Sequence, residues 1–413
     1  MTIWNGLGSI DKIEDAQIKL NLMVEAVIGP KTAHLWRTTD PSLIPEQIKR
    51  MDAVTFRAIE NLVGQPITQT QYEQATLPKR CAGAGFVNVG KTAPISFASS
   101  LSMTADIQKR LLKDILPNSP TSTRKSPKAL ELVASLLNGQ TVDSLDTAIS
   151  HSQFHLVNHQ RKVNESRFTD LKATASIVDK ARILSCAEGG SPWIGAVAYG
   201  DTKMENAGVR TGLCLLLGAD VFAKKTPCLK PCKVFQDRCG VHALTCNTGG
   251  DRTGKHNELR DEWCKILKEA GISACTEPLG ILVGEANQKP ADVYAPLFED
   301  GHAYAFDLGV THPQGQSVLR SASMTALHAA DAYALKKRNK YEVQCRVRGI
   351  VFEPLIVETF GAWTVSANKI FKRVGGFLAI KLNIPKSVAI HRIKQRLAVK
   401  LQTGNACQIC ARY

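Results

Sequence analysis

Four residues in the middle of the chain have the spacing of a metal-binding knuckle. Three residues separate Cys228 from Cys232, nine separate Cys232 from His242, and three separate His242 from Cys246. Thiolate and imidazole are preferred zinc ligands, and short loops let two close pairs reach one ion. The spacing therefore predicts a structural zinc site with four protein ligands and no open position. Cys239, inside the loop, could replace one member of the first pair.

The distribution of the twelve cysteines supports a metal before disulfides. Six of them lie between Cys228 and Cys275, interleaved with histidines. Disulfide scaffolds belong to small secreted chains, and nothing near the start of this large chain indicates secretion. Buried reduced cysteines are the alternative interpretation. Cys407 and Cys410 form another C-x2-C pair, but no partner pair lies nearby, so we interpret them as a feature of the chain end without metal.

Three acidic residues fall on three consecutive predicted strands. Glu277 lies on the first strand, Asp292 enters the second, and Asp307 lies in the third. Carboxylates that meet at the ends of neighbouring strands can hold a hard divalent cation such as Mg²⁺. Such an ion activates water and stabilises charge on a phosphate that undergoes displacement. The alternative is that these acids are ordinary strand-edge residues.

The elements that must position these residues differ between the two halves of the chain. Residues 1 to about 220 show helical periodicity, as in the apolar stripe of residues 48–62. After about residue 225 the pattern predicts, in order, a helix, three strands, a helix and a strand, at residues 255–270, 274–282, 291–298, 303–310, 323–341 and 349–357. We therefore expect a mostly α N-terminal half and a compact α/β unit near the C-terminus. The last 40 residues predict one or two basic amphipathic helices.

Composition excludes several classes of protein and points to a polyanionic partner. Among 413 residues, 44% are hydrophobic and 22% charged, which is globular usage and excludes wholesale disorder and fibrous rods. No run of 18 apolar residues occurs, so we expect no membrane span. We expect an intracellular, nuclear location. The net charge is +15, and residues 333–413 carry 16 Lys and Arg against three acids. Nucleic acid is the natural partner of such a chain, although a solvated basic face is the alternative.

One segment matches a nucleotide-binding motif in its residues but not in its predicted structural context. Residues 85–92 match the P-loop pattern G-x4-G-K-[ST]. A P-loop needs a strand that leads into the loop and a helix that begins at the lysine. The preceding residues 76–84 do not have the pattern of a buried strand. We therefore interpret the segment as a glycine-rich surface turn.

The acidic pair and its context resemble a known nuclease family. Pro290-x-Asp292 followed by Asp307 one strand later, within the order helix, three strands, helix, strand, resembles the PD-(D/E)xK restriction-endonuclease-like nucleases. Most members carry a lysine two residues after the second acid, where this chain has Gly309. In the endonucleases of site-specific non-LTR retrotransposons the lysine lies on the following helix, in a Lys-x-x-Lys-Tyr signature. Lys337, followed three residues later by Lys340 and then Tyr341, fits that signature.

Other segments extend the resemblance upstream. The retrotransposon branch has a Cys/His knuckle before the nuclease and a basic-His motif on its first helix, to which Lys255, His256 and Arg260 correspond. The resemblance implies that these three residues, with Tyr341, contact DNA. We expect Asp261 to pair with a nearby basic side chain. Residues 77–99 and 208–218 are similar to segments around the thumb of the reverse transcriptase. No Tyr/Phe-Ala-Asp-Asp motif is present, so the chain alone should not synthesise DNA.

The resemblance implies a five-part organisation. We expect a region resembling the reverse-transcriptase thumb at 1–116, a helical connector at 117–224, the knuckle at 225–250, a restriction-endonuclease-like domain at 251–365 and a basic helical tail at 366–413. Residues 1–224 would be mostly helical, and the C-terminal domain would have the α/β restriction-endonuclease-like fold.

The function implied is a DNA endonuclease of a retroelement that nicks target DNA for integration. Asp292 and Asp307 would hold Mg²⁺ or Mn²⁺, Glu277 would assist, and Lys337 or Lys340 would stabilise the phosphate during displacement. The partners would be DNA, element RNA and other retroelement proteins, with no membrane. A non-catalytic DNA- or RNA-binding fragment, or a decayed copy of the element, is the main alternative. A nucleotide-binding protein that uses residues 85–92 is a third.

Overall fold

The computed structural model describes residues 10, 12–115, 126–232, 234–281, 290–299 and 301–412. These residues form two compact units, and each is described by itself. The first contains Leu22–Cys81 and Gly85–Thr174, and the second contains Asp15–Asn21, Ala82–Ala84 and Ala175–Tyr413. The expected boundary after residue 116 therefore falls within the first unit. The other three expected boundaries fall within the second.

In its described residues, the first unit consists of helices joined by loops and turns, without a strand. After a π-helical segment at Leu22–Val27, its main helices are α3 (Ile28–Thr38), α4 (Pro45–Val63), α5 (Gln69–Ala75), α6 (Val89–Ile115), α7 (Pro127–Leu136), α8 (Val142–Ser150) and α9 (Leu156–Thr174). Helix α4 begins with a proline, which is suited to a first helical position, and ends at Gly64 with a left-handed φ of 81°. Its buried stripe includes Ile48, Met51, Ile59 and Leu62, as the periodicity predicted. The helical N-terminal half is thereby confirmed.

The P-loop-like segment lies at the start of α6. No strand precedes it, because residues 82–88 are irregular and α6 begins at Val89. The Asp52 carboxylate accepts hydrogen bonds from the N–H groups of Val89 at 2.7 Å and Gly90 at 3.0 Å. The helix N-terminus that would face a phosphate in a P-loop is thus bonded to an acid of the chain itself. The Gly-Lys-Thr residues of the motif, 90–92, lie in the first turn of α6, and not in the glycine-rich surface turn that the sequence predicted.

The second unit contains a small sheet surrounded by helices. Its main helices are α2 (Ala16–Asn21), α10 (Ile177–Gly189), α11 (Asn206–Leu217), α12 (Val241–Thr245), α13 (Asp251–Glu269), α14 (Leu319–Ala322), α15 (His328–Val347), α16 (Val365–Leu382) and α17 (Lys386–Cys410). Its strands are β1 (Cys275–Thr276), β2 (Val293–Glu299), β3 (His302–Thr311) and β4 (Ile350–Glu358). The predicted order of helix, three strands, helix and strand is present. The predicted first strand shrinks to two residues, and its end at Leu282 lies outside the described residues.

The four strands form a mixed sheet in the order β1-β2-β3-β4. Strands β1, β2 and β3 pair antiparallel, whereas β3 and β4 pair parallel, with Asp307 opposite Pro354. A parallel pair needs a crossover connection, and α15 supplies it. Strand β3 is therefore the inner strand between β2 and β4, and Asp307 lies in its middle.

The two faces of the sheet are covered by different helices. Side chains alternate along a strand, and Phe306 and Leu308 of β3 belong to a core shared with α13, α16 and α17. Trp263 of α13 meets Phe306 edge-on at 5.6 Å between ring centroids. Gly309, the position after Leu308, faces α15 on the other side of the sheet, because a Cβ there would meet Tyr333. Asp307 shares that parity and so faces α15.

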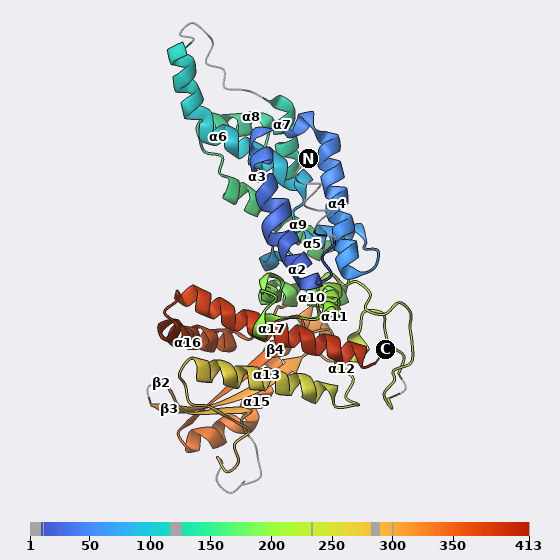
Figure 1. Ribbon diagram of the computed structural model, residues 1–413, viewed down its shortest axis with the longest axis vertical. Helices are drawn as coiled ribbons and strands as arrows, with labels where there is room; N and C mark the ends of the chain where they lie inside the picture. The colour runs from blue at the N-terminus through green and yellow to red at the C-terminus, as the bar shows by residue number, and fades with distance from the viewer. Residues whose placement is uncertain are drawn as a thin grey trace. The chain divides into compact units, whose positions relative to one another are not determined.

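The C-terminal helices differ most from the prediction. Figure 1 shows α17 running beside α13 within the second unit, and α16 and α17 contribute Phe371, Ile393 and Leu397 to its main core. Arg396 is buried and forms ion pairs with Glu262 and Glu269. The helices within the expected basic tail at 366–413 therefore contribute to the core of the second unit. Among the described residues, no helix has both the length and the apolar composition needed to cross a membrane.

Candidate functional site

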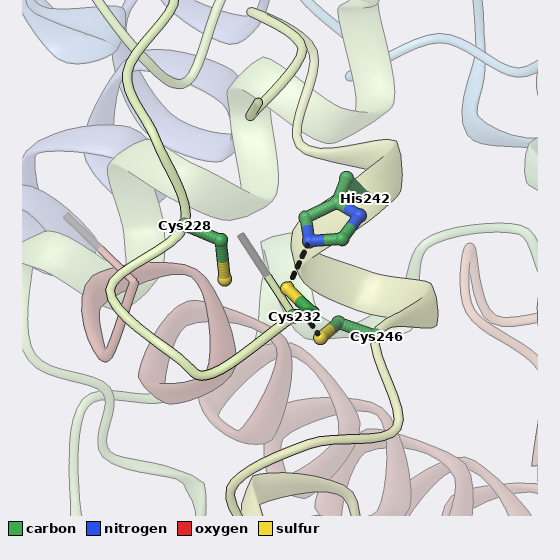
Figure 2. A group of neighbouring side chains, drawn as sticks. All are labelled: Cys228, Cys232, His242 and Cys246. Carbon is green, nitrogen blue, oxygen red and sulfur yellow. Dashed lines mark hydrogen bonds between the residues drawn. The ribbon is translucent and has the colours of Figure 1, made fainter. Parts of the chain in front are cut away.

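The Cys/His knuckle brings the four predicted ligands together. The ligand atoms of Cys228, Cys232, His242 and Cys246 all lie within 4.8 Å of one another. Cys232 Sγ lies 3.4 Å from His242 Nε2 and 3.7 Å from Cys246 Sγ, and Figure 2 shows these side chains converging from a loop and from α12. Three thiols and one imidazole are a donor set suited to zinc. The cluster could therefore hold a metal ion such as zinc.

The chain supports the cluster from both sides. The Asp237 carboxylate accepts hydrogen bonds from the N–H groups of Val241 at 2.8 Å and His242 at 2.6 Å, which fixes the first turn of α12. The buried guanidinium of Arg412 donates to Thr248 O at 2.9 Å and to Asp251 Oδ2 at 2.6 Å. The end of α17 is thereby tied to the start of α13 and to the segment after Cys246.

The electrostatic surroundings of Cys246 favour a thiolate. Burial raises the pKa of its thiol, but hydrogen bonds from Thr248 and Arg412 outweigh burial and bring the pKa to about 7. Zinc binds the thiolate form of cysteine. Cys239 is exposed and lies outside the cluster, so it does not replace a ligand. Cys407 and Cys410 are exposed and belong to no cluster of potential ligands in the described part of the chain.

Asp292 and Asp307 lie side by side at the junction of β2 and β3. Asp292 immediately precedes β2, and its N–H donates to Phe306 O at 2.9 Å. Asp292 Oδ2 accepts hydrogen bonds from Leu308 N at 2.7 Å and from His256 Nε2 at 2.9 Å. The Asp292 hydrogen bond raises the pKa of His256, despite partial burial. His256 of α13 therefore holds and orients the carboxylate of the first acid.

Asp307 is the more deeply buried of the two acids. Burial raises its pKa to about 7; the charge of Asp292 adds to this effect, and Lys337 opposes it. Lys337 Nζ lies 3.0 Å from each of the two carboxylate oxygens and donates a hydrogen bond to Oδ1. Oδ2 accepts no hydrogen bond from any described residue. A buried carboxylate oxygen with free acceptor capacity beside a second acid is suited to a cation.

Lys337 reaches Asp307 because α15 and β3 advance in step. Four residues of helix rise about 6 Å, and two residues of strand rise about 6.6 Å. Tyr333 lies over Gly309, Lys337 meets Asp307, and Tyr341 packs against the small core that contains Ala305. Every fourth residue of this helix face therefore meets every second residue of the strand.

The same packing explains the glycine at position 309. A Cβ atom there would lie 2.7 Å from Ile356 Cδ1 and 2.8 Å from Tyr333 Cε1. Both distances are shorter than packed carbon atoms allow, so a side chain at this strand position would require Ile356 and Tyr333 to shift. The helix supplies both the ring that fills the space and the ammonium group one turn later. Tyr333 was missed by sequence reasoning, although its i, i+4 relation to Lys337 places both residues on one face.

The third predicted acid is placed differently from the expectation. Glu277 donates its backbone N–H to Asp292 O at 2.9 Å, but its carboxylate contacts the guanidinium of Arg260. Across the described ranges, the acid pair and Glu277 do not form a three-ligand cluster. Arg260 also donates to Asp261 Oδ1 at 2.8 Å, so Asp261 pairs with a nearby basic side chain, as expected.

Three further predicted residues lie away from the acid pair or away from the surface. Lys340 is exposed, and its ammonium lies 4.6 Å from the ring centroid of Tyr341. Tyr341 is half-buried and packs against Phe352, 5.8 Å between ring centroids, and its contact with DNA stays a prediction. Lys255 is 5% exposed and donates to Asn405 Oδ1 at 3.0 Å, so its amine is buried and does not lie on the open surface.

A cavity of about 520 Å³ adjoins the acid pair. Its wall includes His256 and Lys337, which bond Asp292 and Asp307 respectively. Lys255 of α13 and His312, the residue after β3, line it as well. The acid pair therefore has next to it a space of the size that holds small ligands in proteins.

Comparison with known proteins adds no relative from which roles could be transferred. No protein-family model matches the chain, and no curated protein matches its sequence.

Proposed function

We propose that the second unit is a divalent-metal-dependent endonuclease that hydrolyses DNA phosphodiester bonds, with Asp292, Asp307 and Lys337 at its centre. The observation that carries this proposal is the position of Lys337 Nζ, 3.0 Å from both carboxylate oxygens of Asp307, with Asp292 alongside. Two acids and one ammonium are the groups needed to hold a hard cation and to stabilise the charge of a phosphate.

The acid pair fits a magnesium or manganese ion. Asp307 Oδ2 is buried beside Lys337 Nζ, at 3.0 Å, and the proximity of Asp292 raises the pKa of Asp307 further than burial alone. A cation between the carboxylates would remove the repulsion between the two acids. When bound, such an ion supplies Lewis acidity and lowers the pKa of water.

The remaining residues position these groups. His256 and the Leu308 N–H hold one oxygen of Asp292, so the carboxylate has a fixed orientation. Burial lowers the pKa of Lys337, but the Asp307 carboxylate outweighs burial and raises it, so the ammonium stays charged at neutral pH. A charged ammonium beside the acids can neutralise a phosphate oxygen as negative charge develops during displacement.

The surrounding architecture supports a restriction-endonuclease-like domain of a retroelement protein. The order of helix, three strands, helix and strand, with acids on β3 and just before β2, is the order that the resemblance implies. The knuckle lies directly upstream, and in this proposal it holds a structural zinc ion that braces the start of α13. Glu277 has no direct catalytic role here, because it pairs with Arg260.

The proposal is tested by nicking of supercoiled plasmid by the full chain with magnesium or manganese. Asp292→Asn and Asp307→Asn should each abolish nicking as completely as the double variant, because the two acids act as one unit. Each variant should still bind DNA. Lys337→Ala should lower the rate by a factor on the order of 100 or more. Lys340→Ala is the matched control on the same helix and should keep most of the rate, because its ammonium does not contact Asp307.

The main rival is a non-catalytic nucleic-acid-binding fragment, which the net charge of +15 alone would support. Binding without nicking under every metal and substrate tried would favour that rival. Nicking that survives Asp292→Asn at the original rate would show that the active site lies elsewhere.

A further inference from the structure

The cavity beside the acid pair is lined by basic groups that have no acidic partner. Lys255 and Arg252 of α13 and His312 after β3 form part of its wall. In the described part of the chain, neither Lys255 nor Arg252 forms an ion pair with a carboxylate. Buried cations in proteins are normally paired. Lys255 is buried without a carboxylate partner, and the exposed Arg252 lies at the rim, so the lining of this cavity is suited to an anion.

His312 gives an independent indication of a ligand. Its side chain is 8% exposed, yet neither ring nitrogen forms a hydrogen bond with any described residue. Burial, followed by the charge of Lys255, lowers the pKa of His312 to about 3, while the charge of Asp237 and the polar side chain of Gln314, which lies close to the ring without an aligned hydrogen bond, oppose this to a smaller extent. The ring is therefore neutral and carries one N–H donor. A buried donor in a cavity wall calls for an acceptor within that cavity.

Lys255 points to the same kind of ligand. Its one hydrogen bond is to the neutral Asn405 Oδ1, and its stem packs against Gly404, where a Cβ would lie 2.5 Å from Lys255 Cγ. Burial, then Arg252 and Arg412, lowers the pKa of Lys255 to about 7. An anion in the cavity would stabilise the charged amine, accept from His312 and attract the exposed Arg252 at the rim.

We infer that this cavity is an anion subsite that binds one phosphate group, next to the phosphodiester held at Asp292 and Asp307. Lys255 and His312 would donate to the phosphate oxygens from inside, and Arg252 would contact them from the rim. The inference rests on the proposed function only in taking the phosphate to belong to the nucleic acid being cut. The cavity is large enough for one phosphate with its sugar. A free phosphate ion or mononucleotide offers the same chemistry, and the experiment separates these sources.

The first arm measures binding of inorganic phosphate to the zinc-loaded full chain by calorimetry, without magnesium. Lys255→Met and His312→Leu keep side-chain volume and remove the donors, and Arg252→Gln changes an exposed position that does not threaten folding. Each should weaken phosphate binding about tenfold or more, because a charge-assisted or buried hydrogen bond is lost. Lys268→Met, at an exposed position of α13, is the matched control and should leave it unchanged.

The second arm measures the salt dependence of duplex DNA binding for the same variants. If a backbone phosphate occupies the subsite, Lys255→Met should reduce the log–log salt slope by about 0.9 relative to Lys268→Met. A loss of phosphate binding with an unchanged slope would assign the subsite to a free phosphate and overturn the nucleic-acid assignment. Phosphate binding that is unchanged in Arg252→Gln and in whichever buried variant folds would overturn the subsite itself. Neither arm measures cutting, so a failure of the nuclease proposal remains distinguishable.

Discussion

Replacing Lys255 by methionine should change the stability of the protein in a direction that depends on pH. Lys255 is 5% exposed, and its only polar partner in the described residues is Asn405 Oδ1, at 3.0 Å. Burial and the neighbouring Arg252 and Arg412 lower the pKa of its amine from 10.5 to about 7. Methionine has a similar unbranched shape and carries no charge, so it isolates the cost of burying the ammonium group.

The size of the stability difference between Lys255→Met and the wild type follows from the linkage between protonation and folding. The folded pKa is lower than the unfolded one, so between about pH 7 and 10.5 the unfolded chain binds more protons, and wild-type stability rises with pH by about 1.4 kcal/mol per unit. Below pH 7 the full penalty applies, at most about 5 kcal/mol. Methionine avoids this penalty but leaves Asn405 Oδ1 without its donor, at a cost of about 2 kcal/mol. Lys255→Met should therefore be more stable by about 3 kcal/mol at pH 6, and less stable than wild type above about pH 9.

Urea unfolding followed by tryptophan fluorescence from pH 6 to 10, in phosphate-free buffer with zinc held constant, measures this difference. Lys268→Met, at an exposed position of the same helix, should show no comparable trend. A Lys255→Met variant that is less stable than wild type at pH 6, with a difference independent of pH, would mean that the amine is neutral or solvated and would refute the reasoning. Added phosphate should reduce the pH dependence of the wild type alone, because an anion beside Lys255 favours its charged form.

Two further expectations concern the knuckle and the tightly packed glycine. Cys232→Ser should lower the bound zinc measured by elemental analysis well below one ion per chain, whereas Cys239→Ser should keep it, because only Cys232 lies in the ligand cluster. Gly309→Ala should destabilise the protein by about 1–3 kcal/mol in denaturant unfolding, because its Cβ would meet Tyr333 and Ile356 within 2.8 Å. Gly254→Ala is the control. Gly254 is exposed within α13, and a Cβ there would meet no atom within 4 Å, so this substitution should stabilise the protein by about 0.5–1 kcal/mol.

The parts of the structure that sequence could predict are those with local signatures. The hydrophobic periodicity predicted α4 and β3 within a few residues, because burial of one face leaves a repeating pattern in the chain. The Cys228 to Cys246 spacing identified the knuckle, because four ligands on short loops are a local arrangement. The pairing of Asp292 with Asp307 followed from placing them on consecutive strands.

The parts that sequence could not predict depend on contacts between distant segments. The basic composition of residues 366–413 suggested a solvated tail, but Arg396 pairs with Glu262 and Glu269, more than a hundred residues earlier. Composition records the charge of a segment and not its partner. Lys255 was likewise expected to contact DNA. Its burial depends on Gly404 and Asn405, which lie about 150 residues later, so no nearby part of the sequence reveals it.

The choice between Lys337 and Lys340 shows where local and long-range information meet. Both lysines fit the signature Lys-x-x-Lys-Tyr, and sequence alone leaves them equivalent. In the structure, the step of α15 along β3 places Tyr333 over Gly309 and therefore Lys337, one turn later, at Asp307. Once the glycine is recognised as the space for an aromatic ring, the lysine four residues after that ring becomes the necessary partner of the acid two residues before the glycine.

A lysine supplied from a helix makes the site depend on how that helix packs. A strand-borne lysine is held by the hydrogen bonds of the sheet itself, whereas Lys337 is held by the fit of α15 against β4. Small residues Ala330 and Ala334 let the helix approach Ile356 closely. The buried Glu358 carboxylate accepts from the Ala330 N–H at 3.3 Å and so fixes the start of the helix. Side chains that never contact the acid pair therefore set the position of the ammonium, because a shift of α15 along β3 would move Lys337 away from Asp307.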